Sequence, residues 1–163
     1  MGATHKMIYL DHAATTAVYP EVIREMTPYL HDYYYNPSSS YKEGRLLHKK
    51  LDQIRTVLAG GIHAKPQEII FTSGGTESDN WVLVNAARSL CGKGRHIITS
   101  AIEHHAILHT CHFLENCGFD LTYLPVNREG FVEPAVLEKA IRPDTILISV
   151  MFANNEIGTI QPI

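Results

Sequence analysis

The chain has 163 residues, a formal net charge of -3, 45% hydrophobic residues and 19% charged residues, which is typical of a globular protein and excludes a disordered or collagen-like chain. The longest strongly apolar run, residues 145–153, is far shorter than the roughly 18 residues of a membrane-spanning helix. The basic residues are scattered rather than interleaved with aromatic side chains, so the charge pattern of a nucleic-acid-binding protein is missing. We expect no membrane and no nucleic-acid partner.

The N-terminus and the cysteines indicate the compartment. Residues 1–6 contain no apolar leader, and Cys91, Cys111 and Cys117 show no CxxC spacing. A secretory signal, a disulfide framework and a zinc ribbon are therefore not indicated. We expect a cytoplasmic protein.

The first 67 residues predict a mixed N-terminal segment. In chain order we expect a short strand at 8–10, a helix at 21–30 after Pro20, a loop rich in Tyr, Pro and Ser at 33–40, and a helix at 42–58. In the second helix Leu47, Leu51, Ile54 and Leu58 form one apolar stripe. The tyrosines of the loop favour surface packing or an oligomer contact over chemistry.

From residue 68 onward, apolar β-branched runs alternate with segments of helical period. We expect strands at 68–73, 96–101, 120–126 and 145–152, and helices at 76–91, 104–117 and 134–141. This alternation predicts an α/β fold with a mostly parallel sheet flanked by helices. We divide the chain into an N-terminal segment, residues 1–67, and the first part of a larger α/β domain, residues 68–163.

The sharpest local motif is TSGGTESDN at residues 72–80, where a predicted strand runs through two glycines into a helix. Free N–H groups in the first turn of a helix, with glycines that allow close approach, bind anions such as phosphate. The motif matches neither GxGxxG nor the Walker A pattern. Alternatively, Thr76 only caps the helix and Asp79 completes a pair resembling a capping box. The spacing fits both interpretations.

A second motif begins at Glu103-His104-His105, where a predicted strand gives way to a helix. His104 would lie at the carboxyl end of a strand, the edge where open α/β sheets bind ligands, and its imidazole could stack on a ring or move protons. His105, His109 and His112 share one helix face, so a three-histidine zinc site is conceivable. A solvated polar face is the simpler interpretation, because no Cys, Asp or Glu completes a ligand motif, and we expect no metal.

The third motif, NNEIG at residues 154–158, follows the last predicted strand. Two amides and a carboxylate at this edge can bind a ligand in the cleft, although Asn-Asn also favours turns. Three polar clusters thus converge on one edge of one sheet, which favours a binding site there.

These motifs, together with LDHAATT at 10–16 and NPSS at 36–39, resemble in order and spacing the N-terminal part of the cysteine desulfurases. Those are pyridoxal-phosphate enzymes of the class V aminotransferase superfamily, of the NifS/IscS type. The resemblance implies the type I pyridoxal-phosphate-dependent transferase fold. It also implies that Gly75 and Thr76 hold the cofactor phosphate, that His104 stacks on the pyridine ring and assists proton transfer, and that Asn155 contacts the ring hydroxyl side and the substrate.

The resemblance further implies an activity. The family converts L-cysteine to L-alanine and leaves the sulfur as a persulfide on an enzyme cysteine, from which it is delivered to a scaffold protein for iron-sulfur cluster assembly. Pyridoxal 5'-phosphate is the electron sink, and the complete enzyme would be a homodimer.

The sequence departs from the family in two ways. Tyr41 stands where the family usually has a histidine, and the chain stops at Ile163, whereas family members are more than twice as long. The Schiff-base lysine and the persulfide cysteine lie in the part beyond, and no lysine or cysteine here matches their motifs. We expect an N-terminal fragment, inactive alone, that needs the C-terminal remainder of the enzyme as a complementing segment.

Two other interpretations stay open at this point. The chain could come from another class V enzyme, such as a selenocysteine lyase or an aminotransferase, because substrate choice depends largely on residues beyond Ile163. It could also be a non-catalytic module that binds a partner chain, or zinc through its helical histidines.

Overall fold

The computed structural model describes residues 7–163, which form two compact units, one ending at Phe71 and the other spanning Thr72–Ile163. Residues 1–6, on which we expected no leader, lie outside the described residues. Our division into domains after residue 67 stays a prediction. None of the helices described between residues 7 and 163 has the length and apolarity needed to span a bilayer.

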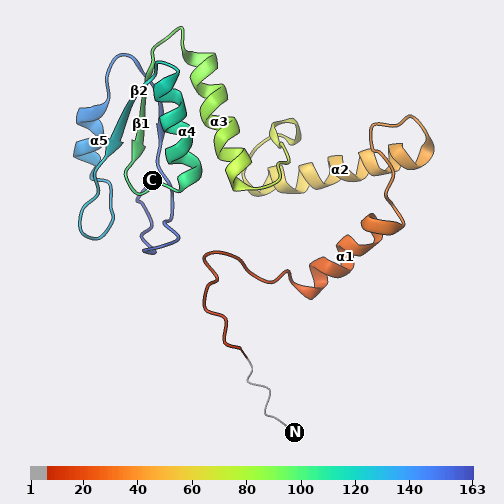
Figure 1. Ribbon diagram of the computed structural model, residues 1–163. Coiled ribbons are helices and arrows are strands. Elements are labelled where there is room, and N and C mark those ends of the chain that lie inside the picture. Colours follow the sequence, from red (N-terminus) through yellow and green to blue (C-terminus); the bar gives the residue numbers. More distant parts are fainter. Residues whose placement is uncertain (1–6) are drawn as a thin grey trace. The chain divides into compact units, whose positions relative to one another are not determined.

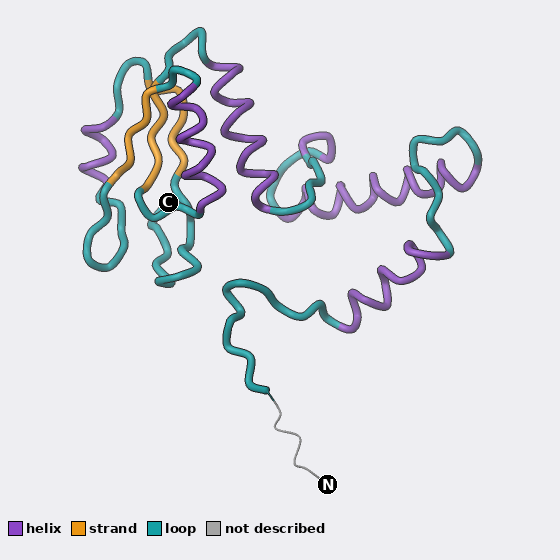
Figure 2. The backbone as a smooth tube through the Cα atoms, viewed as in Figure 1, coloured by secondary structure: helices purple, strands orange, loops and turns teal. Residues whose placement is uncertain are grey.

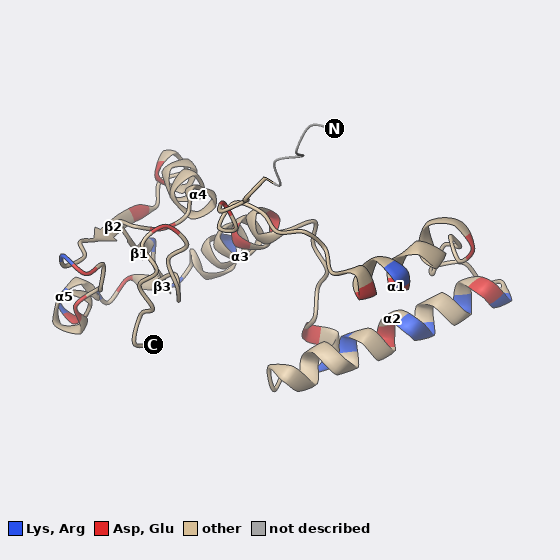
Figure 3. Cartoon of the chain, turned by 90° about the horizontal axis from the view of Figure 1, so that it is seen from below, with Lys and Arg blue, Asp and Glu red and all other residues tan. Residues whose placement is uncertain are grey.

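The N-terminal unit, ending at Phe71, contains the helices α1 (Pro20–His31) and α2 (Lys42–Gly61) and the single turn η1 (Pro66–Glu68). Both predicted helices are confirmed, and Pro20 occupies the first turn of α1, where its missing N–H is tolerated. Basic and acidic residues both occur along α2 (Figure 3). Apolar side chains of α1 and α2 line a hollow of about 400 Å³, among them Met26, Leu47, Leu51 and Ile54.

The strand expected at residues 8–10 is wrong, because the described segment there is irregular and makes no ladder. The start of α2 requires a glycine. A Cβ on Gly44 would lie 2.7 Å from the carbonyl oxygen of Asn36 and 2.8 Å from that of Ser39, so the turn before α2 packs on the helix only because this residue is glycine.

The sheet unit, Thr72–Ile163, is built on a parallel three-stranded sheet in the order β2-β1-β3 (Figures 1 and 2). Its strands are β1 (His96–Ser100), β2 (Asp120–Leu124) and β3 (Thr145–Ser149), and its helices are α3 (Gly75–Leu90), α4 (His105–Asn116) and α5 (Pro134–Ala140). The predicted parallel α/β fold is therefore confirmed.

Helices cover both faces of this sheet. The helices α3 and α4 pack together on one face, and α5 lies on the other (Figure 1). Side chains alternate along β1, so Ile97 faces the core beneath α3 and α4 while Ile98 faces the core beside α5. All five residues of β1 are buried, as expected for a central strand of a parallel sheet.

The strand expected at residues 68–73 is also wrong. The chain there leaves η1 and runs without ladder pairing to α3, with Ile70 and Phe71 exposed. A β-strand exists only where a neighbour accepts its N–H and C=O groups, and β1, β2 and β3 pair only with one another among the described residues. The apolar run has the composition of a strand but no partner among the described residues.

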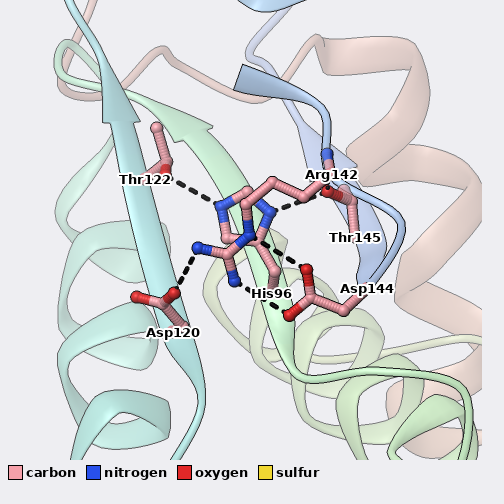
Figure 4. Close-up of polar contacts among 6 residues, drawn as sticks. All are labelled: His96, Asp120, Thr122, Arg142, Asp144 and Thr145. Carbon is pink, nitrogen blue, oxygen red and sulfur yellow. Dashed lines mark hydrogen bonds and ion pairs between the residues drawn. The ribbon is translucent and has the colours of Figure 1, made fainter. Parts of the chain in front are cut away.

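A buried histidine, the first residue of β1, contacts side chains of both neighbouring strands (Figure 4). His96 is fully buried, with Nδ1 2.7 Å from the Thr145 hydroxyl and Nε2 2.8 Å from the Thr122 hydroxyl. The backbone N–H of Arg142 donates to the Thr145 hydroxyl, so that hydroxyl can donate its own proton to Nδ1. The neutral ring then carries its proton on Nε2, which donates to Thr122.

Ion pairs surround this histidine. The guanidinium of Arg142 bonds to the carboxylates of Asp120 and Asp144 (Figure 4). Burial lowers the pKa of His96 below its usual 6.5, and the charge of Arg142 lowers it further. The fold therefore favours the neutral imidazole.

This burial predicts a loss of stability in acid. As the pH falls through about 6.5, His96 binds a proton in the unfolded chain but stays neutral in the folded chain. The free energy of unfolding should therefore decrease with falling pH until the pH is below the pKa of His96 in the folded chain. We expect His96→Gln to remove most of this slope in urea unfolding measured from pH 8 to pH 5. The matched control is His109→Gln, whose ring is exposed; an equal loss of slope in both variants would contradict the assignment.

Candidate functional site

The carboxyl ends of β1 and β3 lie at one edge of the sheet, because the two strands are parallel. His104 follows β1 and begins α4, and Asn155 follows β3. Two of the three predicted polar clusters therefore lie at this edge, as the sequence indicated.

The third cluster forms the start of α3, which no side chain caps. Glu77 turns back instead, and its carboxylate accepts hydrogen bonds of 2.7 Å from both the N–H and the hydroxyl of Ser73. These bonds, the backbone one first, lower the pKa of Glu77. The alternative in which Thr76 caps the helix with Asp79 is wrong, since Thr76 lies within the first turn. The first N–H groups of α3 are left for another acceptor.

The backbone before these N–H groups is open. An added Cβ would meet nothing within 4 Å at Gly74 or at Gly75. Gly74 is extended, with φ 165°, a conformation that any residue adopts, so neither strain nor a neighbour in this chain requires glycine. Open space beside free helix amides is what a tightly bound anion needs.

Thr76 and His104 line one hollow of about 420 Å³ between the amino ends of α3 and α4, which we call the α3–α4 hollow. His104 is the N-cap of α4, and its Nδ1 accepts a 3.0 Å hydrogen bond from the N–H of Ala106. Since Nδ1 is an acceptor, the neutral ring carries its proton on Nε2. An exposed imidazole with a fixed tautomer can stack on a ring and exchange a proton through Nε2.

Asn155 belongs to the same edge but does not line the α3–α4 hollow. Its side chain is exposed, and its amide nitrogen lies 3.1 Å from the carboxylate of the adjacent Glu156. The structure thus brings Thr76 and His104 to one hollow, with Gly75 adjacent to Thr76 in the chain, and leaves Asn155 outside the lining of that hollow.

The helical histidines do not converge on a metal site. His105 and His109 stack with ring centroids 5.4 Å apart, whereas His112 bonds to Glu115 at 2.8 Å and lies against Tyr123. Within residues 7–163 no three His, Cys, Asp or Glu side chains are placed to hold a metal ion. The zinc interpretation has no geometric support in this region.

A polar link between α3 and α4, which sequence reasoning missed, lies under the hollow. Thr110 is 4% exposed, and its hydroxyl lies 2.6 Å from Oδ1 of Asn80 and 2.8 Å from the carbonyl of Ala106. The amide of Asn80 donates in turn to the carbonyl of Thr76 at 2.8 Å. This link connects the first turn of α3 to the first turn of α4, and both Asn80 and Thr110 line the hollow.

Known proteins with similar sequences identify the family of this chain. Residues 8–163 match the family described as "Aminotransferase class-V". A cysteine desulfurase IscS of Dictyoglomus turgidum is 56% identical over 156 residues, which are 96% of this chain and 40% of that protein. One of Methanosarcina thermophila is 54% identical over 163 residues, with 100% and 40% covered. The chain thus spans about 40% of the length of the curated relatives it matches.

Solved structures show the same fold. A "NIFS-like protein" superposes with a TM-score of 0.89 at 41% identity, over 92% of this chain and 41% of that one. A structure titled "SspA in complex with cysteine" gives a TM-score of 0.89 at 41% identity, over 94% and 44%.

The link between the helices is testable by a conservative pair of variants. Thr110→Val keeps the shape but leaves Oδ1 of Asn80 without its donor, so the free energy of unfolding should fall by about 1–3 kcal/mol. Thr110→Ser keeps the hydroxyl and should lose less. Urea unfolding measures both; equal losses would assign the effect of Thr110 to packing.

Proposed function

Because the chain belongs to the class-V aminotransferase family, we propose that it forms the N-terminal, cofactor-holding part of a pyridoxal-phosphate-dependent cysteine desulfurase. One observation carries the proposal. The uncapped start of α3 and the exposed ring of His104 face the same hollow, which suits a ligand with an anionic group at one end and a flat ring at the other.

The chemical groups of these residues match the phosphate and the ring of pyridoxal 5'-phosphate. The amide of Gly75 and the amide and hydroxyl of Thr76 would bind the phosphate, and the space beside Gly74 admits it. The ring of His104 would cover one face of the pyridine and hold a proton on Nε2. Asn155 would contact the ring hydroxyl and the substrate. When bound, the cofactor supplies an electron sink for negative charge that develops on the substrate.

The names of the relatives, which are cysteine desulfurases, support the substrate. We propose conversion of L-cysteine to L-alanine, with the sulfur passed to an enzyme cysteine and then to a scaffold protein for iron-sulfur cluster assembly; the related SspA structure is titled as a complex with cysteine. The lysine that binds the cofactor covalently and the sulfur-accepting cysteine would come from the C-terminal remainder of the enzyme. We propose a cytoplasmic homodimer for the complete enzyme.

The proposal is tested first by the intact mass of every polypeptide in the purified protein, together with its visible absorbance. We expect a yellow chromophore in a sample that contains the remainder of the enzyme, either in one longer chain or as a second polypeptide. A chain of 18.3 kDa that is a stable, compact monomer in solution without any partner would contradict it.

Substitutions in the complete enzyme test the individual roles. Thr76→Ala removes a hydrogen bond to a charged group and should weaken retention of pyridoxal phosphate about 10-fold or more. His104→Ala should slow the formation of L-alanine from L-cysteine about 100-fold or more. Thr56→Ala, on α2, is the threonine control.

Cofactor titration and steady-state turnover measure these effects. Unchanged cofactor affinity and rate in both variants would refute the assigned roles, since neither residue would then touch the cofactor or the substrate.

A further inference from the structure

Two dipeptides at the carboxyl edge of the sheet follow the same pattern. In Glu103-His104 and in Asn154-Asn155, the first side chain is buried and the second is exposed. Glu103 is 7% exposed and Asn154 is 8% exposed. Buried polar groups are retained only where they are hydrogen-bonded, so the partners of these two side chains indicate what they do.

The carboxylate of Glu103 bridges two strands. Its Oε1 accepts a 2.7 Å hydrogen bond from the hydroxyl of Ser100, the last residue of β1, and another of 2.7 Å from the backbone N–H of Met151, just beyond β3. This oxygen thus continues the connection between β1 and β3 past the end of their ladder.

The amide of Asn154 makes the return connection. Its Nδ2 donates to the carbonyl of Ile102 at 2.9 Å. Its Oδ1 accepts from the N–H groups of Glu156 and Ile157 at 2.8 and 3.0 Å, and these bonds shape the turn that carries Asn155. Each side chain therefore reaches across to the backbone beside the other.

We infer that Glu103 and Asn154 form a reciprocal clasp that sets the spacing between the ring of His104 and the amide of Asn155. The inference rests on the proposed function, in which these two exposed groups contact one cofactor. Glu103 and Asn154 touch no ligand themselves; they are positioning residues. A site whose groups must be held to within about 0.5 Å needs such support from buried hydrogen bonds.

The role depends on the reach of the Glu103 side chain. Met151 and Ser100 both donate to one oxygen, so an amide oxygen at the same position serves as well. Glu103→Gln keeps that oxygen and loses the charge. Glu103→Asp keeps the charge but withdraws the oxygen by one methylene, which opens the clasp.

Two readouts in the complete enzyme test this pair of variants. The first is hydrogen exchange of the Met151 N–H in the cofactor-free protein, and the second is the affinity for pyridoxal phosphate. For Glu103→Asp we expect exchange about 10-fold faster and cofactor binding about 10-fold weaker, because the Met151 N–H loses its acceptor and Asn155 shifts. Glu103→Gln should stay within about 3-fold of wild type in both. Glu138→Ala, at an exposed position on α5, is the carboxylate control.

The opposite result would overturn the clasp. If Glu103→Gln weakens binding and Glu103→Asp does not, the charge of Glu103 acts on the site directly. If both variants keep wild-type exchange and affinity, the bonds have no positioning role. Wild-type enzyme that binds no pyridoxal phosphate would instead refute the proposed function, while the exchange result would still report on the clasp.

A variant of Asn154 tests whether the two side chains of the clasp depend on each other. Asn154→Asp keeps the acceptor for the Glu156 and Ile157 amides but places an oxygen against the carbonyl of Ile102. We expect faster exchange at Met151 and weaker cofactor binding, with the turn at 154–157 intact. Unchanged exchange at Met151 would show that the two side chains act independently and would contradict the clasp.

Discussion

The parallel pairing of β1 with both of its neighbours is the constraint on which the rest of the sheet unit depends. Parallel strands need a crossover between each pair, and here helices supply the crossovers and cover both faces of the sheet. The same geometry brings every strand to the same edge at its carboxyl end. Residues distant in sequence, such as His104 and Asn155, therefore lie at the same edge of the sheet, although they do not contact each other. A ligand site at this edge can combine residues from several loops.

Buried polar side chains at both ends of β1 form hydrogen bonds to neighbouring segments of the chain. At the amino end His96 joins the hydroxyls of two flanking strands, and at the carboxyl end Glu103 joins β1 to the chain after β3. A leucine at either position would bury more apolar surface but would not distinguish one strand register from another. Hydrogen-bonding groups do distinguish them, because a strand that slipped in register would leave these groups unsatisfied at a cost of about 1–3 kcal/mol each. These side chains thus fix how the ends of the strands line up, and at the carboxyl end that alignment bears on the site.

Much of this fold could be predicted from the sequence, because helical period and short apolar runs are local signals. The helix predicted at 42–58 and the strand predicted at 96–101 begin where α2 and β1 begin and differ from them only at the carboxyl end. The failures arise where structure depends on distant partners. Residues 68–73 have the composition of a strand but no ladder among the described residues. Asn154 looks like a turn residue, and nothing local shows that its amide reaches Ile102, 52 residues away. At the start of α3, the sequence offered Thr76 as the cap, whereas Glu77 reaches Ser73, since several acidic and hydroxyl side chains compete there.

No lysine of the sheet unit lies near the residues proposed to contact the cofactor. Its lysines are Lys93 and Lys139. Lys93 follows the carboxyl end of α3, a helix of 16 residues and hence about 24 Å long, so it lies far from Thr76 at the other end. Lys139 is in the last turn of α5, on the opposite face of the sheet from α3 and α4. Neither can reach a carbonyl carbon in the α3–α4 hollow. In the proposed function the unit would therefore hold the phosphate and the ring by noncovalent contacts alone, and the amine that binds the cofactor covalently would come from outside the unit.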